Sequence, residues 1–311
     1  MGGLKGRPWV ETHEDGQGVK GKRVISDYVI LVVLVLFMIM CLVPILNTIA
    51  ISFSDRVSAQ GGHVFLLPIN FTTAPYENLM RDSQFFRSFW ISVQRVLLGG
   101  TINVVLCILT AYPLSKTVEH FRAKNKYVWY MIFLMLFNGG LIPTYVLVVQ
   151  LGLINSIWAL VLPGAVPIFS VIVLMNYYKT IPASLEEAAL MDGAGPWYIL
   201  LKVYVPLAKP CIAVVALWSV VNHWNAFFDG LIYNTSPARF PLQTYIQSLN
   251  TAIDWQRIAD MRGEDIARLL EVSNLTFDAA KVVVAMLPVL IIYPFLQRYF
   301  VTGIVMGAVK E

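Results

Sequence analysis

Between residues 182 and 206 the sequence reads PASLEEAALMDGAGPWYILLKVYVP. This polar segment, broken by glycines, separates two apolar runs at roughly 157–178 and 207–228, each long enough to cross a bilayer. Ser184 is a good helix N-cap and Glu187 follows three residues later, so the spacing predicts a capping box that begins a helix at Ser184. Gly193 permits a bend between two short helices. The segment therefore predicts a bent helical loop between two membrane spans.

The composition of the whole chain is that of a membrane protein. Of its 311 residues 57% are hydrophobic and only 14% are charged, and the mean hydropathy is +0.66. A soluble domain is less apolar than this. Runs of about 20 apolar residues predict spanning helices, at roughly 28–52, 88–113, 127–150, 157–178, 207–228 and 282–300. We therefore expect an all-α integral membrane fold with six transmembrane helices in residues 28–311, after a tail of residues 1–27.

The distribution of Lys and Arg predicts the orientation of these spans, because basic residues in short loops stay in the cytoplasm. The tail and the segment 114–126 are both rich in Lys and Arg, whereas the segment 229–281 is net acidic. The first two are expected inside and the third outside. Six spans then place both termini and the loop 182–206 in the cytoplasm. The net charge of +4 follows from this topology and gives no reason to expect a nucleic-acid partner.

Glycines and prolines interrupt several predicted spans. In a bilayer the freed backbone groups are tolerated only where protein or a wet cavity satisfies them, so these breaks favour a transporter over a simple anchor. The predicted breaks are Asn138-Gly139-Gly140 with Pro143 in the third span, Pro163 and Pro167 in the fourth, and Pro288 and Pro294 in the sixth. Outside the spans, short helices are expected near residues 76–87 and 254–270.

The loop also carries a family signature. Its order of residues resembles closely the EAA signature of ATP-binding-cassette importer permeases, in Glu187-Ala188-Ala189, Asp192-Gly193-Ala194 and Pro206. The resemblance covers about residues 28–311, with a core permease region at about 86–300, and implies a type I ABC importer transmembrane subunit. It implies that the coupling loop, residues 182–206, docks on an ATPase, with Glu187 facing a basic residue there.

Further partners follow from the same resemblance. It implies a second homologous permease, two ATPase subunits that hold ATP and Mg, and an extracytoplasmic solute-binding protein that meets the external loop 229–281, all at a bacterial cytoplasmic membrane. The segments 137–145 and 303–310 look like one subgroup of the maltose-type carbohydrate permeases, whose members handle pectin fragments and alginate. An acidic oligosaccharide is therefore the expected cargo. An importer of another nutrient, such as an amino acid or phosphate, is the alternative.

The chain itself carries no signature of an enzyme. Gly16, Gly21 and Lys22 have the spacing of a phosphate-binding loop, but Arg23 stands where Ser or Thr should hold magnesium, and no apolar strand precedes them. The four histidines are too dispersed for a metalloprotease motif, and the sequence contains no Gly-x-Ser-x-Gly. We expect no catalytic site, no metal site and no cofactor bound by this chain, and the three scattered cysteines are expected to be free.

The fifth predicted span carries a candidate substrate path. Trp218, Asn222 and Asn225 are spaced four and three residues apart and share one helical face. Amides and aromatic rings together suit a sugar, and Trp224-Asn225 is similar to the pattern in carbohydrate permeases. The alternative is that the two asparagines hold this helix to its neighbours and that Trp224 anchors it at the interface. His223 is interpreted as interfacial.

Two polar residues in other spans complete the candidate path. Arg95 lies about two turns into the second span, where a charge is costly and usually functional. It either extends to the outer interface beside Gln94 or attracts an acidic sugar. Asn138 lies at the predicted break of the third span.

Overall fold

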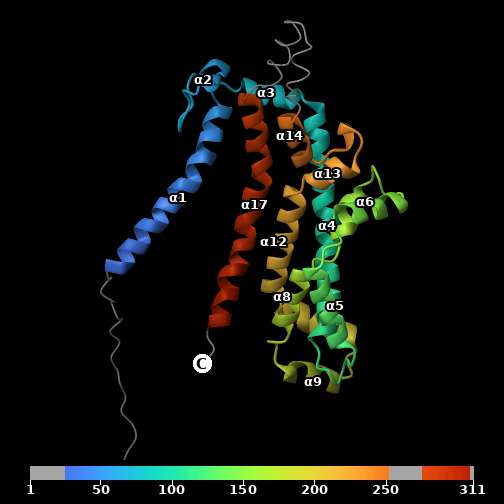
Figure 1. The fold of residues 1–311 in the computed structure, drawn as a ribbon. Coiled ribbons are helices and arrows are strands. Elements are labelled where there is room, and N and C mark those ends of the chain that lie inside the picture. Colours follow the sequence, from blue (N-terminus) through green and yellow to red (C-terminus); the bar gives the residue numbers. More distant parts are fainter. Residues whose placement is uncertain (1–24, 252–274, 309–311) are drawn as a thin grey trace, which may run out of the picture. The chain divides into compact units, whose positions relative to one another are not determined.

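The computed structural model describes residues 25–251 and 275–308 (Figure 1). Two compact units make up the chain, residues 1–46 and 47–311. The described part of the first unit is the greater part of α1 (Ile25–Ser52). Its side chains are exposed from Tyr28 to Leu42, as suits a helix whose solvent is hydrocarbon. The second unit is a helical bundle, and the transport-related residues lie in it.

Long and short helices alternate in the second unit because glycines and prolines divide its apolar runs. After α2 (Arg56–Gln60), α3 (Ala74–Arg81) and α4 (Ser83–Ser115), the described elements are α5 (Lys124–Leu136), α6 (Leu141–Gln150), α7 (Ile157–Val161), a 3-10 turn (Leu162–Gly164), α8 (Ile168–Tyr178), α9 (Ala183–Met191), α10 (Pro196–Ile199), a π-helical turn (Leu200–Tyr204), α11 (Val205–Leu207), α12 (Lys209–Asn225), α13 (Phe228–Tyr233), a 3-10 turn (Pro237–Arg239), α14 (Leu242–Thr251) and α17 (Leu275–Ala308).

The described helices match the predicted spans. Three of them, in α1, α4 and α17, are long and apolar enough to cross a membrane. Three bent pairs bring the number to as many as six: α5 with α6, α7 with α8, and the segment 196–207 with α12. The all-α membrane fold expected from the sequence is confirmed in the described residues.

The predicted breaks were partly correct. The third span bends by 110° after Leu136, where Gly140 has a φ of +90° that favours glycine, and the fourth bends by 48° before Ile168. By contrast, α17 is continuous through Pro288 and Pro294, so these prolines do not end the helix, and the predicted kink of the sixth span stays a prediction. An 82° bend before α12 was not predicted.

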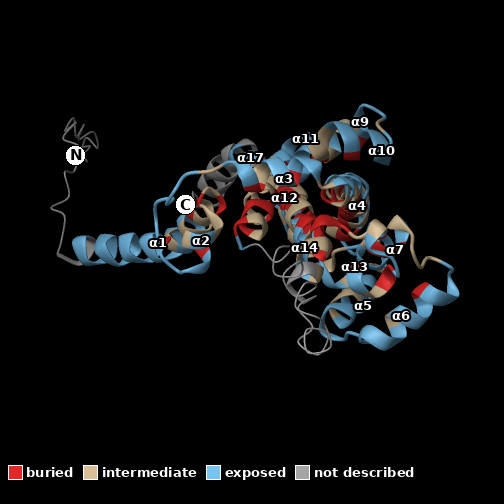
Figure 2. Ribbon diagram, turned by 90° about the horizontal axis from the view of Figure 1, so that it is seen from above, coloured by how far each residue is buried: buried red, intermediate tan, exposed pale blue. Residues whose placement is uncertain are grey.

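The core of the second unit lies where α4, α8 and α12 meet (Figure 2). Small residues allow α4 and α12 to approach closely: a Cβ added to Gly99 would lie 2.5 Å from the ring of His223. On the other side of α12, α17 packs against α12 and α3. No residue of α5 or α9 is buried, so these two helices lie at the periphery of the core.

The two segments that were predicted to be external contain short helices. The helix expected near residues 76–87 is α3, and it ends at Arg81 because Asp82 caps the start of α4, accepting bonds from the backbone N–H groups of Gln84 and Phe85. In the second segment α13 and α14 lie at the end of the bundle opposite α9 (Figure 1). The helix expected near residues 254–270 falls outside the described residues.

Candidate coupling site and transport path

The helix α9 begins one residue before the predicted N-cap. Its N-cap is Pro182, which makes no side-chain cap bond, and Ser184 lies inside the first turn. The predicted capping box of Ser184 and Glu187 is therefore wrong. The physical reason is that Pro182 already has a φ of −57° and ends the preceding loop, so the helical conformation starts at Ala183.

The bend after α9 is at the predicted glycine. The N–H of Gly193 donates to the carbonyl of Leu190 at 3.0 Å, and the N–H of Ala194 donates to that of Ala189 at 2.9 Å. Together with a φ of +79° at Gly193, these two bonds form a Schellman motif, which turns the chain at a helix end. The predicted role of Gly193 is thus confirmed.

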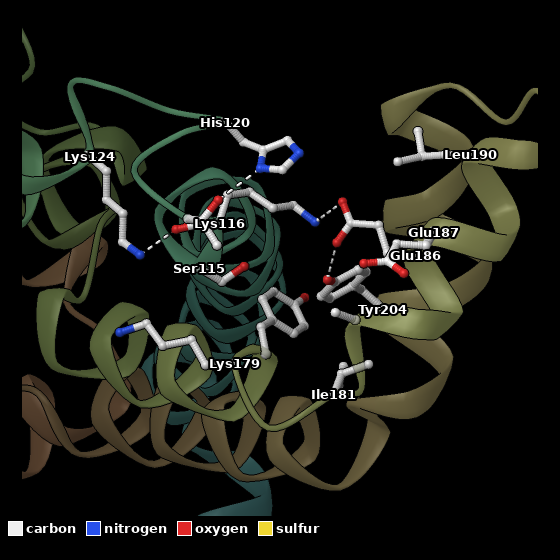
Figure 3. Close-up of a pocket in the computed structure, with 13 residues that line it drawn as sticks. Ser115, Lys116, His120, Lys124, Lys179, Ile181, Glu186, Glu187, Leu190 and Tyr204 are labelled. Atoms are coloured by element: carbon white, nitrogen blue, oxygen red, sulfur yellow. Dashed lines mark hydrogen bonds and ion pairs between the residues drawn. The ribbon is translucent and has the colours of Figure 1, made fainter.

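Two adjacent glutamates of α9 have different surroundings (Figure 3). The carboxylate of Glu186 accepts a bond from Lys116 Nζ at 2.6 Å and another from the hydroxyl of Tyr204, also at 2.6 Å. The Lys116 ammonium lies over the rings of Tyr112 and Tyr204, 4.0 and 4.1 Å from their centroids. Glu187 is exposed, and within the described residues its side chain makes no hydrogen bond or ion pair. The sequence singled out Glu187 and missed Glu186.

The electrostatics of this ion pair follow from its contacts. Burial by itself would raise the pKa of Glu186, but the hydrogen bonds from Lys116 and Tyr204 and the Lys116 charge outweigh burial and hold that pKa below its ordinary value. Burial lowers the pKa of Lys116, and the hydrogen bond to Glu186 opposes this effect. Glu186 is therefore a carboxylate at neutral pH.

A cleft of about 410 Å³ opens beside this ion pair. Basic side chains line one wall and both glutamates of α9 line the other, and the basic residues are Lys116, His120, Lys124 and Lys179. Of the predicted coupling residues only Glu187 lines this cleft. Glu187, Ala188, Asp192, Gly193 and Pro206 are exposed, whereas Ala189 and Ala194 are half-buried against the core. This surface can receive another protein, because its exposed residues have no partner in the described chain that would cover them.

The three residues of the predicted stripe lie at the surface of α12. Trp218, Asn222 and Asn225 are all exposed, and the side chains of the two asparagines make no hydrogen bond within the described residues. Val215 and Ser219, nearer the middle of α12, are buried. The two asparagines are therefore free to contact a ligand or another chain, whereas the ring of Trp218 lies against that of Phe169, with the centroids 5.3 Å apart.

Trp224 and His223 are not at the interface. Trp224 is 4% exposed, and its indole N–H donates to the carbonyl of Ala285 in α17 at 3.0 Å. His223 is also buried and its Nε2 lies 3.1 Å from Asn103 Oδ1. The interfacial interpretations of both residues are wrong. The reason is that a step of one residue rotates a helical side chain by about 100°, so Asn225 faces outward while Trp224 faces α17. Trp224 packs in the core and, with Asn225, also lines a pocket of about 260 Å³ against α14 and α17, so its place in a substrate path stays a prediction.

Arg95 does not extend to an interface either. It is 3% exposed, and its guanidinium forms an ion pair with Asp229, with Nη1 3.0 Å from Oδ1. It also donates to the carbonyls of Ala226 and Leu160. These bonds tie α4 to α7 and to the turn after α12. The interpretation that Arg95 extends to the outer interface is wrong. Both of its Nη atoms are bonded within the chain, whereas its buried Nε has no partner in the described residues. The partner, Asp229, was missed because it lies 134 residues away in the sequence.

Asn138 shapes the break of the third span. Its Oδ1 accepts a bond from the backbone N–H of Gly140 at 2.9 Å, which stabilises the turn between α5 and α6. The side chain is exposed.

Residues 118–306 match the family described as "Binding-protein-dependent transport system inner membrane component". The chain belongs to this family. It is 32% identical over 292 residues to the polygalacturonan/rhamnogalacturonan transport system permease protein YtcP of Bacillus subtilis, covering 93% of this chain and 99% of that protein. It is 34% identical over 269 residues to the protein LplC of the same organism, covering 86% and 89%.

A solved structure is similar as well. The crystal structure of a bacterial ABC transporter involved in the import of the acidic polysaccharide alginate contains a chain 31% identical to this one, with a TM-score of 0.79 over 89% of this chain and 96% of that chain. The fold is therefore that of a type I ABC importer subunit, and the protein is a multi-pass membrane permease. The class of protein predicted from the EAA signature is confirmed.

Proposed function

We propose that this permease is one subunit of an ATP-driven importer that moves an acidic oligosaccharide into the cytoplasm by alternating access. The observation that carries the proposal is that relatives aligned over most of both chains are named for polygalacturonan and alginate, two acidic polymers. An importer of an amino acid or of phosphate is less well supported, because the relatives that align over most of both chains are named for polysaccharides.

The exposed coupling surface supports docking on an ATPase. Glu187 is free for a basic residue of that partner, and a charge-assisted contact there would fix the register of the joint as well as add affinity. ATP and Mg belong to two copies of this ATPase. In this arrangement α9 and both termini lie in the cytoplasm of a bacterium, and the bundle spans its cytoplasmic membrane.

The opposite end of the bundle is the natural place for a solute-binding protein. The segments with α13 and α14 lie at that end (Figure 1), and a solute-binding partner agrees with the family's description. A second homologous permease completes the path. Closure of the ATPases on ATP would move α9 and shift the bundle between inward-open and outward-open states, since a ligand acts only through its different affinity for two states.

The exposed stripe of α12 is the proposed contribution of this chain to the path. The amides of Asn222 and Asn225 can bond sugar hydroxyls, and the ring of Trp218 can pack against a sugar's C–H face. The guanidinium of Arg95 is held by Asp229, so the negative charge of the cargo has to be recognised elsewhere, by the solute-binding protein or the partner permease.

Uptake by intact cells tests this function. A strain that lacks this permease should lose import of labelled oligogalacturonate or oligoalginate, and keep import of amino acids and phosphate. The wild-type gene should restore import, whereas Glu187→Lys should leave the protein in the membrane but fail to restore it. Unchanged uptake of both acidic oligomers in the deletion strain would refute the acidic cargo, and a loss of amino acid or phosphate uptake would favour the alternative.

A further inference from the structure

The coupling helix α9 is held to the bundle in an unusual way for a helix that has to transmit movement. None of its nine residues is buried, so hydrophobic packing provides little of its attachment. Ala189 packs only partly against the core. The strongest polar attachment of α9 in the described chain is the carboxylate of Glu186, through its two bonds of 2.6 Å.

The two glutamates cannot share this task. Adjacent residues of a helix point about 100° apart, and here Glu186 faces the bundle while Glu187 is exposed at the cleft. Both glutamates line the same cleft, but the Glu186 carboxylate is already bonded to Lys116 and Tyr204, whereas that of Glu187 has no partner in the described residues and is available to another protein. The pair divides an external contact from an internal one.

Glu186 joins α9 to two other segments at once. Lys116 follows the last residue of α4, and Tyr204 ends the π-helical turn that leads into α11 and α12. Tyr204 is itself 5% exposed, and its ring packs edge-on against Tyr112 and Tyr178 in the core. Displacement of α9 thus pulls directly on groups whose positions the core fixes.

The surroundings of Lys116 favour a single geometry. Its ammonium is enclosed by the rings of Tyr112 and Tyr204 and by the Glu186 carboxylate, and its side chain is 14% exposed. Cation–π contacts strengthen when the cation is withdrawn from water. An exposed ion pair would let either side chain change rotamer freely, whereas this arrangement restrains both.

We propose that Glu186 is the positioning residue that transmits movement of α9 to α4 and to the segment entering α12, while Glu187 makes the contact with the ATPase. This inference rests on the proposed function, because it assumes an ATPase bound at α9. It assigns the coupling of hydrolysis to transport and the assembly of the complex to two neighbouring side chains.

The test uses the complete complex reconstituted in proteoliposomes, with labelled oligogalacturonate, and measures ATPase co-purification, ATP hydrolysis and uptake per ATP. Glu186→Gln should co-purify with the ATPase and hydrolyse ATP, but its uptake per ATP should fall about tenfold, the scale of losing a hydrogen bond between charged groups. The matched variant Glu187→Gln should instead reduce co-purification.

A second variant distinguishes loss of this hydrogen bond from misfolding of the protein. Tyr204→Phe keeps the ring over Lys116 and removes only the hydroxyl, so it should lower uptake per ATP by a few-fold with assembly unchanged. Wild-type uptake per ATP in both Glu186→Gln and Tyr204→Phe would overturn the inference, as would a loss of co-purification in Glu186→Gln equal to that in Glu187→Gln. If the wild-type chain retained no ATPase at all, the proposed function would fail instead.

Discussion

The ion pair of Arg95 and Asp229 predicts an asymmetry between two substitutions. Asp229→Asn removes the counter-charge of a guanidinium that is only 3% exposed, and water cannot replace the lost carboxylate. Arg95→Gln leaves behind a carboxylate that is 28% exposed, which water can partly solvate. Asp229→Asn should therefore be the more destabilising change, although both remove the same pair.

The magnitude follows from the same difference in exposure. Breaking a buried pair so that one charge stays behind costs about 3–5 kcal/mol, and this range applies to Asp229→Asn. For Arg95→Gln the cost is about 1–3 kcal/mol, that of a partly satisfied polar group. At ~2–4 °C per kcal/mol, the gap of about 2 kcal/mol corresponds to a difference of roughly 4–8 °C in the midpoint of thermal unfolding.

Thermal unfolding of the purified complex in detergent measures this difference. Arg95→Met with Asp229→Leu is the matched control, because removing both charges together should cost less than Asp229→Asn alone. Arg95→Gln should also reduce the uptake of acidic and neutral oligosaccharides by the same factor. A midpoint for Asp229→Asn equal to or above that of Arg95→Gln would refute the structural assignment, and so would a selective loss of acidic uptake in Arg95→Gln.

Three further predictions concern α4, the bend at Gly193 and the ion pair of Glu186 with Lys116. Gly99→Ala should destabilise the bundle by about 1–3 kcal/mol, because its Cβ would lie 2.5 Å from His223, whereas Gly100→Ala should be tolerated, since its nearest contact is at 3.9 Å; thermal unfolding of the two variants compares them. Gly193→Ala should cost about 1–2 kcal/mol because of its positive φ, and should lower transport without preventing membrane insertion, as membrane fractionation and uptake would report. The stabilisation from Glu186, whose pKa is depressed, should be complete above its ordinary pKa of 4.5 and vanish as pH falls through the lower folded-state value; the protection of α9 amides from hydrogen exchange, relative to the intrinsic rate at each pH, should fall there in the wild type and not in Glu186→Gln.

The spans were predictable because the signal is local. A run of apolar residues marks a span regardless of what packs on it, and the start of α1's span at Tyr28 and its end at Ser52 agree with the predicted 28–52. The bend at Gly193 was predictable for a similar reason, since few residues other than glycine accept its φ.

The direction in which each side chain of a helix points relative to its neighbours was not predictable in the same way. Periodicity placed Trp218, Asn222 and Asn225 on one face, and that face is exposed, but it could not show that Trp224 turns toward α17. Ion pairs between residues far apart in the sequence could not be predicted for a further reason. Lys116 and Glu186 are 70 residues apart, and no spacing rule connects them until α4 and α9 are folded.

The two ion pairs together suggest why α4 is a single long helix while its neighbours are broken. Arg95 and Lys116 are 21 residues apart, or about 30 Å along a helix. One is held by Asp229, just after α12, and the other by Glu186, just before the segment that enters α12. The helix α4 thus spans the distance between the two ends of α12 and is fixed by a charge at each. Movement of α9 that pulls on Lys116 would therefore be carried along α4 as far as Arg95, which is bonded to Ala226 and Asp229 where α13 begins.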